Sequence, residues 1–203
     1  YGSFTLFPAI GTPVISPVER ASVFSHDTEI ARPHYYSAFL DDFGIKAEMT
    51  ATSRAGFLQF TFPENENATV LLDLFEGKGT VEINPEKKEI TGFSSAKGLG
   101  TPDNFACYFV AQFEKEFKDY KSLNKNKGNE HNAGWVSFKT AENEVVKVKV
   151  GTSFISIEQA RENLMHEIPD WDFEAVCSQT KAAWNTELNK IQIEGGSEDD
   201  KTI

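Results

Sequence analysis

The feature that most constrains the fold is an alternation of apolar and polar residues in the first third of the chain. Residues 45–52 alternate Ile, Ala, Met and Ala with Lys, Glu, Thr and Thr. A period of two is typical of a half-buried β-strand, so the first set is expected to face the core and the second set solvent. Residues 35–40 and 57–62 predict strands on either side, and the last should end at Pro63, which has no N–H for a sheet. The stretch therefore predicts an antiparallel meander.

Short apolar runs separated by Gly, Pro and Asn continue along most of the chain. They lie at residues 4–10, 68–74, 80–83, 89–93, 105–113, 134–140, 145–151 and 152–157. Many short strands with turn residues between them are typical of an antiparallel β-sandwich. The fold class is therefore predicted as mainly β, with the sandwich in residues 1–155. Residues 114–132 interleave lysine and asparagine with acidic residues, and this stretch is predicted as a mobile surface loop.

The periodicity changes at Ser156, where a helix is predicted to begin. Ser156 with Gln159 three residues later fits a capping box, in which the serine side chain accepts a hydrogen bond from the first turn. The apolar residues that follow share one helical face: Ile157, Ala160, Leu164 and Ile168. Pro169 is expected to end this helix because proline cannot continue it.

A second helix is predicted after Asp170 or Asp172, either of which could cap it. Its apolar residues follow a spacing of three and four, so they share a face that needs a partner. The two sheets of a sandwich already cover each other and leave little apolar surface for this purpose. We therefore predict that Phe173, Trp184 and Leu188 form a domain interface.

The domain organisation follows from these patterns. Residues 156–196 are predicted as a helical linker after the sandwich. Ser197 with Asp200 three residues later opens a further helix pattern, and the chain stops at Ile203 before that helix could form. Residues 197–203 are therefore predicted as the start of a helical domain that a longer polypeptide would complete.

Composition and charge exclude several classes of function. The formal net charge of -11 and the pI near 4.9 argue against nucleic-acid binding, which requires a basic surface. No apolar run approaches the roughly 20 residues that a membrane-spanning helix needs. The two cysteines, Cys107 and Cys177, are too few for a disulfide framework, and free buried thiols are favoured over a bridge. No cysteine-rich metal spacing is present, so no metal site is predicted within the chain.

The connection before the meander combines Ser25-His26-Asp27-Thr28-Glu29 with Pro33-His34-Tyr35-Tyr36. This block is the most specific of several that resemble the amino-terminal β-sandwich domain of the bacterial α-mannosidases of glycoside hydrolase family 92. Further blocks lie at residues 40–45, 50–52, 148–157, 168–173 and 193–197. Because they follow the family's order over nearly the whole chain, chance is a poor explanation.

The resemblance implies a sandwich of the supersandwich type that packs against a following (α/α)6 catalytic domain. It implies a parent enzyme that is a calcium-dependent, exo-acting α-mannosidase working with inversion, through a glutamic acid as general acid and an aspartate as base. The family's catalytic residues and calcium ligands belong mainly to the barrel, so no catalytic residue and no metal ligand is assigned to this chain. Family motifs that reach the substrate would lie before Tyr1. A periplasmic or extracellular location and a mannose-containing glycan substrate are also implied.

Two groups of polar residues are candidates for chemistry within the chain. A glycosidase needs two carboxylates that flank the scissile bond, and Asp41-Asp42 is the obvious pair. Adjacent residues at a strand end point to opposite faces, however, and Asp-Asp-x-Gly is typical of a turn. His26, Asp27 and Glu29 could instead line a sugar pocket or a contact between domains, and we predict them as substrate-binding residues. The simpler interpretation of these three is a loop with a turn and surface salt bridges.

A different class of function remains open. The chain could be a free-standing carbohydrate-binding or adhesion module without catalysis. Such modules stack sugars on exposed aromatic side chains, whereas the aromatic residues here mostly occupy alternating strand positions, which suggests a core.

Overall fold

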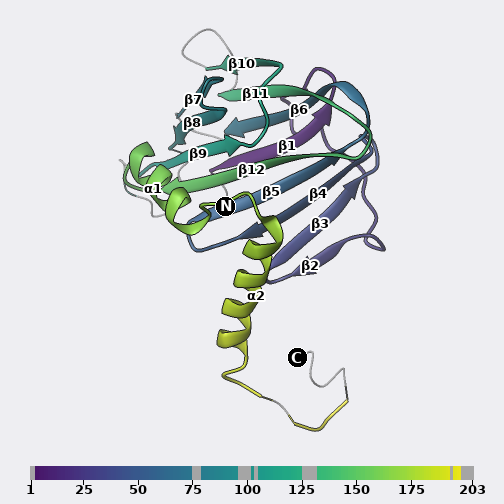
Figure 1. Cartoon of the computed structure of the whole chain (residues 1–203), viewed down its shortest axis with the longest axis vertical. Coiled ribbons are helices and arrows are strands. Elements are labelled where there is room, and N and C mark those ends of the chain that lie inside the picture. The colour runs from purple at the N-terminus through teal and green to yellow at the C-terminus, as the bar shows by residue number, and fades with distance from the viewer. Residues whose placement is uncertain are drawn as a thin grey trace.

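The computed structural model describes residues 3–74, 79–95, 102, 105–124, 132–192 and 194–197. Two antiparallel sheets face each other, and two helices follow them at the carboxyl-terminal end of the chain (Figure 1). This arrangement confirms the predicted antiparallel β-sandwich and the change to helix after it.

The smaller sheet has four strands. Their order across the sheet is β1 (Phe4–Ile10), β6 (Asn65–Leu74), β11 (Ala133–Thr140) and β10 (Asp119–Leu123). All three pairings are antiparallel, and β1 and β10 form the edges.

The larger sheet has eight strands and contains the predicted meander. Their order is β2 (Ile30–Arg32), β3 (Tyr35–Leu40), β4 (Ile45–Ala51), β5 (Ala55–Phe62), β12 (Glu144–Ser153), β9 (Cys107–Phe113), β8 (Glu89–Ser94) and β7 (Gly79–Asn84). β12 lies in the middle of the sheet, between β5 and β9. The strand that leads directly into the helices is therefore also a central strand of the sandwich.

Phenylalanine dominates the core between the sheets. The side chains of Phe60, Phe62, Phe109, Phe113 and Phe138 are all less than 2% exposed. Burying each side chain of this size contributes about 1.5–3 kcal/mol relative to leaving it in water. The aromatic residues at alternating strand positions thus form the core, as the sequence pattern predicts.

The predicted faces of β4 are wrong in its second half. Glu48 and Thr50, which were expected to face solvent, are only 7% and 4% exposed because a helix covers the outer face of the sheet at this point. Met49 on the opposite face is 37% exposed. It lines an open groove with Leu58 of β5 and Phe4 of the edge strand β1. The alternation itself is confirmed, but local sequence could not show which face is covered.

The stretch 114–132, predicted as a mobile loop, contains a strand. β10 pairs with β11 from Asp119–Ser137 to Leu123–Ala133. Four of its five residues are exposed, so this edge strand has no apolar alternation that would mark it. Part of the predicted loop, including His131, lies outside the described residues.

Both predicted helices are present, and Asp172 is the one of the two candidate residues that caps the second. α1 spans Ile157–Glu167, and its N-cap Ser156 accepts a hydrogen bond from the backbone N–H of Gln159 at 3.1 Å. α2 spans Phe173–Leu188, and its N-cap is Asp172. Neither helix is long and apolar enough to cross a membrane, within the residues described. Cys107 and Cys177 are both free and buried.

The helices bury a second core on the outer face of the larger sheet. α1 packs on β12 and β9, and the first turns of α2 pack on β4 and β5. Buried apolar residues join helices to sheet here: Ala55, Phe57, Val110, Ala160, Leu164, Ile168, Phe173, Val176 and Cys177. The rest of α2 projects away from the sandwich (Figure 1).

Candidate functional site

The structure brings together two of the three predicted substrate-binding residues. His26 and Glu29 lie in the connection between β1 and β2, with 2.6 Å between the imidazole Nδ1 and the carboxylate Oε2. The hydroxyl of Tyr36 donates to the other carboxylate oxygen of Glu29, also at 2.6 Å. The hydrogen bond from Tyr36 and a second from His26 hold the pKa of Glu29 below its ordinary value.

Asp27 does not join this pair. It is exposed, and its backbone N–H donates to the side-chain oxygen of Ser25 at 3.2 Å. Both carboxylate oxygens of Glu29 already accept a hydrogen bond, while the His26 side chain is 84% exposed. The cluster can therefore present an imidazole to a ligand or to another domain. The arrangement also matches the simpler interpretation of a loop closed by a surface ion pair, and a role in substrate binding stays a prediction.

Asp41 and Asp42 form a turn that holds the β1–β2 connection against the β3–β4 hairpin. The backbone N–H of Val23 donates to Asp42 Oδ2 at 2.8 Å, and the N–H of Asp41 donates to the Val23 carbonyl at 3.0 Å. Gly44 closes the turn at a φ of 64°, in the left-handed region that glycine tolerates best. The carboxylate of Asp42 therefore has a structural partner, in agreement with the turn that the sequence predicts.

The predicted domain interface divides into a buried and an exposed part. Phe173 is only 3% exposed and packs edge-to-face on Phe57, with 5.3 Å between ring centroids. The chain's own sandwich therefore covers Phe173, and its role as an interface residue stays a prediction. Trp184 and Leu188, by contrast, are 44% and 56% exposed, and every residue of 181–190 is exposed.

An open groove lies between α2 and the turn that joins β4 to β5. Its volume is about 410 Å³, and one wall carries the indole of Trp184. The other residues that line it are Ala51, Thr52, Ser53, Gln179, Thr180, Ala183 and Glu187. The groove continues the exposed face of α2, so a covering element could fill the groove and bury Trp184 at the same time.

Polar contacts that sequence reasoning missed fasten the helices to the sandwich. Glu167, at the end of α1, accepts hydrogen bonds from the Thr52 hydroxyl at 2.6 Å and from the Arg54 backbone N–H at 2.9 Å. The Arg54 side chain adds an ion pair at 2.7 Å. On the other side of α1, Arg161 pairs with Glu89 of β8, whose side chain is 4% exposed. These partners are 72 to 115 positions apart in sequence, so no local pattern could identify them.

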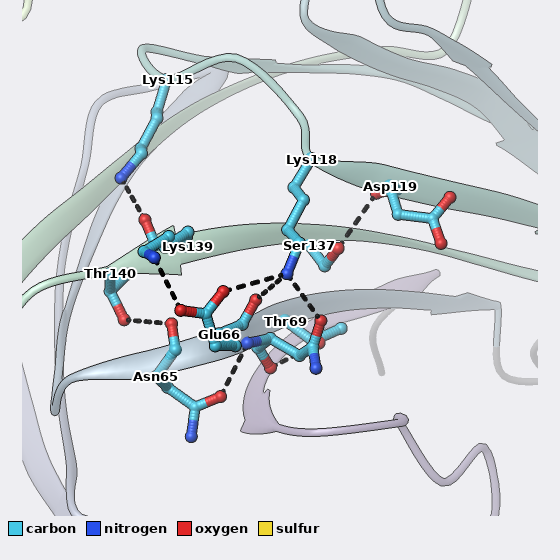
Figure 2. Close-up of polar contacts among 10 residues, drawn as sticks. Asn65, Glu66, Thr69, Lys115, Lys118, Asp119, Ser137, Lys139 and Thr140 are labelled. Atoms are coloured by element: carbon cyan, nitrogen blue, oxygen red, sulfur yellow. Dashed lines mark hydrogen bonds and ion pairs between the residues drawn. The ribbon is translucent and has the colours of Figure 1, made fainter.

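A second charged cluster lies on the smaller sheet. The carboxylate of Glu66 on β6 is 2.6 Å from the ammonium of Lys139 and 3.4 Å from that of Lys118 (Figure 2). These three side chains are 41% to 70% exposed. The contacts connect β6 to β11 and to the segment before β10, and the lysine charges are used within the chain. We assign the cluster a structural role.

Two family models together match nearly the whole chain. The family model described as Glycosyl hydrolase family 92 N-terminal domain matches residues 1–153, and the family 92 catalytic domain matches residues 159–203. An uncharacterized secreted glycosidase of Arthroderma benhamiae is 28% identical over 237 aligned positions, which cover 98% of this chain and 31% of that protein.

Solved structures agree with the family match. A family GH92 inverting mannosidase from Bacteroides thetaiotaomicron superimposes with a TM-score of 0.88 at 30% identity, over 96% of this chain and 27% of that one. A family GH92 α-mannosidase of the same organism, solved with mannoimidazole, gives a TM-score of 0.84 at 30% identity over 97% of this chain. The chain spans less than a third of the length of these relatives. With a family model that matches three quarters of its residues and the sandwich that the solved members share, the chain belongs to glycoside hydrolase family 92.

Proposed function

We propose that this chain is the amino-terminal part of an α-mannosidase that removes α-linked mannose from glycans by an exo-acting, inverting mechanism. The observation that carries the proposal is the match to both family 92 domains in order, together with superposition on solved family mannosidases. The relative solved with mannoimidazole supports a mannose-containing substrate. The curated relative described as secreted supports a location outside the cytoplasm, in the periplasm or beyond the cell.

In this proposal the sandwich supports the remainder of the catalytic domain and contributes no acid or base. Its partner would be the helical part that follows residue 203 in the parent protein. Large apolar side chains remain exposed on the helices, on the segment before α1 and just after α2: Phe154 69%, Ile155 74%, Met165 66%, Trp184 44%, Leu188 56% and Ile191 80%. A contiguous helical domain would bury these groups, which are unfavourable in water.

Calcium would be held by the parent enzyme and not by this segment. A calcium site takes six to eight oxygen ligands at close range. Within the residues that the structure describes, no three acidic, histidine or cysteine side chains are grouped to hold a metal ion. The described part of the chain does not fit a calcium site, and we derive no step through the ion. In the parent enzyme the ion would assist hydrolysis from ligands outside the described segment.

The proposal is tested on the full-length protein that contains this chain. The purified protein is incubated with α-linked mannobiose, and the first anomer released is followed by NMR. We expect free mannose with inverted configuration, activity that is lost with a chelator, and recovery on addition of calcium. Absence of mannose release from every α-linked mannobiose tested would refute the assignment. Release of the retained anomer would refute the inverting mechanism alone.

A free-standing binding module is the second candidate. Exposed aromatic rings are the feature that would favour it, and Phe39 of β3 is 41% exposed on the outer face of the larger sheet. Sugar-binding platforms commonly use several such rings, whereas most strand aromatics here are buried. A glycan array probed with this chain separates the two functions, because a binding module should retain sugar without the catalytic domain.

A further inference from the structure

The connection between α1 and α2 is held by two lysines from the central strand β12. The ammonium of Lys149 donates to the backbone carbonyls of Ile168 at 3.0 Å and Pro169 at 3.1 Å. The ammonium of Lys147, two residues earlier on the same face, donates to the carbonyl of Trp171 at 2.9 Å. Three carbonyls of the short connection therefore accept hydrogen bonds from one strand.

Lys149 is an unusual residue for this position because its side chain is buried. It is only 3% exposed, and burial lowers the pKa of its ammonium, while the carboxylates of Asp170 and Glu114 act in the opposite direction. Burying an ammonium is unfavourable unless close partners replace water. Here the partners are the two carbonyls and the face of Trp171, whose ring centroid is 4.3 Å from the ammonium nitrogen. The charge is therefore used to hold the connection.

The direction of α2 depends on this connection. α2 begins two residues after Trp171, directly after its N-cap Asp172. Its buried residues are Phe173, Val176, Cys177 and Thr180. Every residue of 181–190 is exposed, so the second half of the helix has no support from the sandwich. A small change of angle at residues 168–172 would move the far end of α2 by a much larger distance. The same helix carries Trp184 and Leu188, which the proposed catalytic domain would cover.

We propose that Lys149 is a positioning residue that fixes the direction in which α2 leaves the sandwich, and through α2 the placement of the remaining catalytic domain. The first half of this inference depends only on the contacts of the described chain. The second half rests on the proposed function. Lys147 assists from the same strand through its single bond to the Trp171 carbonyl.

The decisive variant is Lys149→Met, which keeps an unbranched side chain of similar length but removes the charge and every donor. Hydrogen exchange is followed by mass spectrometry in this chain and in the full-length protein. We expect amides in residues 173–180 to exchange at least about tenfold faster, because local opening governs their protection. Lys149→Arg, which keeps cationic donors, should recover much of this protection. Val136→Ala, in the core between the sheets, is the matched control that lowers stability without touching the connection.

Each outcome decides the inference. The inference is supported if Lys149→Met speeds amide exchange in α2 alone, while Val136→Ala speeds exchange to a similar extent throughout the chain. Unchanged α2 protection, or the same uniform change in both variants, overturns it. If Lys149→Met does not fold, Lys147→Met is measured instead, and it must show a smaller increase confined to the same amides.

The activity measurement tests the second half separately. In the full-length enzyme, well below its melting temperature, Lys149→Met should lower kcat/KM for mannobiose by about tenfold or more, since misplacement of a site by an ångström has effects of this size. Val136→Ala of equal melting temperature should retain the parent value. Equal activity in the two variants would overturn the link from Lys149 to the catalytic domain. If the unmodified enzyme releases no mannose, the proposed function fails, and the exchange experiment still decides the role of Lys149 in orienting α2.

Discussion

Replacement of Gly151 by alanine tests how closely α1 must approach the sandwich. Gly151 lies on β12, opposite Ala55 of β5. A Cβ at this position would lie 2.2 Å from the carbonyl oxygen of Ala160 and 2.7 Å from the Cβ of Leu164. Real Cβ atoms do not approach other atoms so closely, and both obstacles are backbone or rigidly attached to it. α1 would have to move away from the sheet.

The expected cost follows from two opposing effects. Overpacking of a tight contact costs about 1–3 kcal/mol when backbone must shift. The gain in strand stability from replacing glycine offsets only about 0.5–1 kcal/mol. We therefore expect Gly151→Ala to lower the free energy of unfolding by about 1 kcal/mol, which is the difference between the midpoints of these two ranges.

Gly56→Ala is the matched control because it lies on the adjacent strand β5, opposite Val150. Its new Cβ would meet nothing closer than 3.9 Å, which is ordinary van der Waals contact. This variant should be neutral or slightly stabilising. Urea unfolding at pH 7, followed by tryptophan fluorescence, measures both. If the two variants have the same unfolding free energy within about 0.5 kcal/mol, the inferred close approach of α1 to β12 is wrong.

Three further predictions concern the helices and the activity of the chain. Glu167→Gln should lower the free energy of unfolding at pH 7 by about 1.5–3 kcal/mol, because it weakens charge-assisted hydrogen bonds to Thr52 and Arg54. In the same urea titration Glu187→Gln, which removes the charge of an exposed ion pair, should change the free energy of unfolding little. Since the folded-state pKa of Glu167 is lowered, this stabilisation is present above its ordinary value of 4.5 and should fade as the pH falls through the lowered value. Trp184→Ala should destabilise the full-length protein by several kcal/mol and this chain by much less, and equal losses would contradict its role as an interface residue. This chain alone should release no mannose from mannobiose. A calorimetric titration of this chain with calcium should show no binding with a sub-micromolar dissociation constant.

Patterns that repeat along the sequence predicted much of the fold. The strands of the meander, both helices and the cap Ser156 follow from local periodicity and turn chemistry, whereas the second cap was left open between Asp170 and Asp172. Local rules succeed here because each element buries one face and the spacing of its apolar residues records which face. The resemblance to family 92 added the identity of the domains, which physical patterns alone did not supply.

Residues whose burial depends on a distant element could not be predicted in the same way. Lys149 alternates with valines on β12, a pattern typical of a solvent-facing residue, yet it is buried because the α1–α2 connection crosses over it. Glu48 of β4 is buried for the same kind of reason, because α2 packs over it. Edge strand β10 was missed for the opposite reason, since its side chains are mostly exposed and carry no pattern. The candidate cluster of His26 and Glu29 was found because its members are close in sequence.

α1 and the first turns of α2 are packed firmly on the sandwich, although the family match assigns both helices to the catalytic domain. The two matched regions end at residue 153 and begin at residue 159, whereas Ala160 and Leu164 lie in a continuous core with Phe57 of β5. A flexible hinge between domains requires few buried contacts, and this boundary has both a buried apolar core and the Glu167 contacts to Thr52 and Arg54. Any movement between sandwich and catalytic domain in the parent protein should therefore begin beyond Thr180, where α2 loses its support, and not at the boundary between the two matched regions.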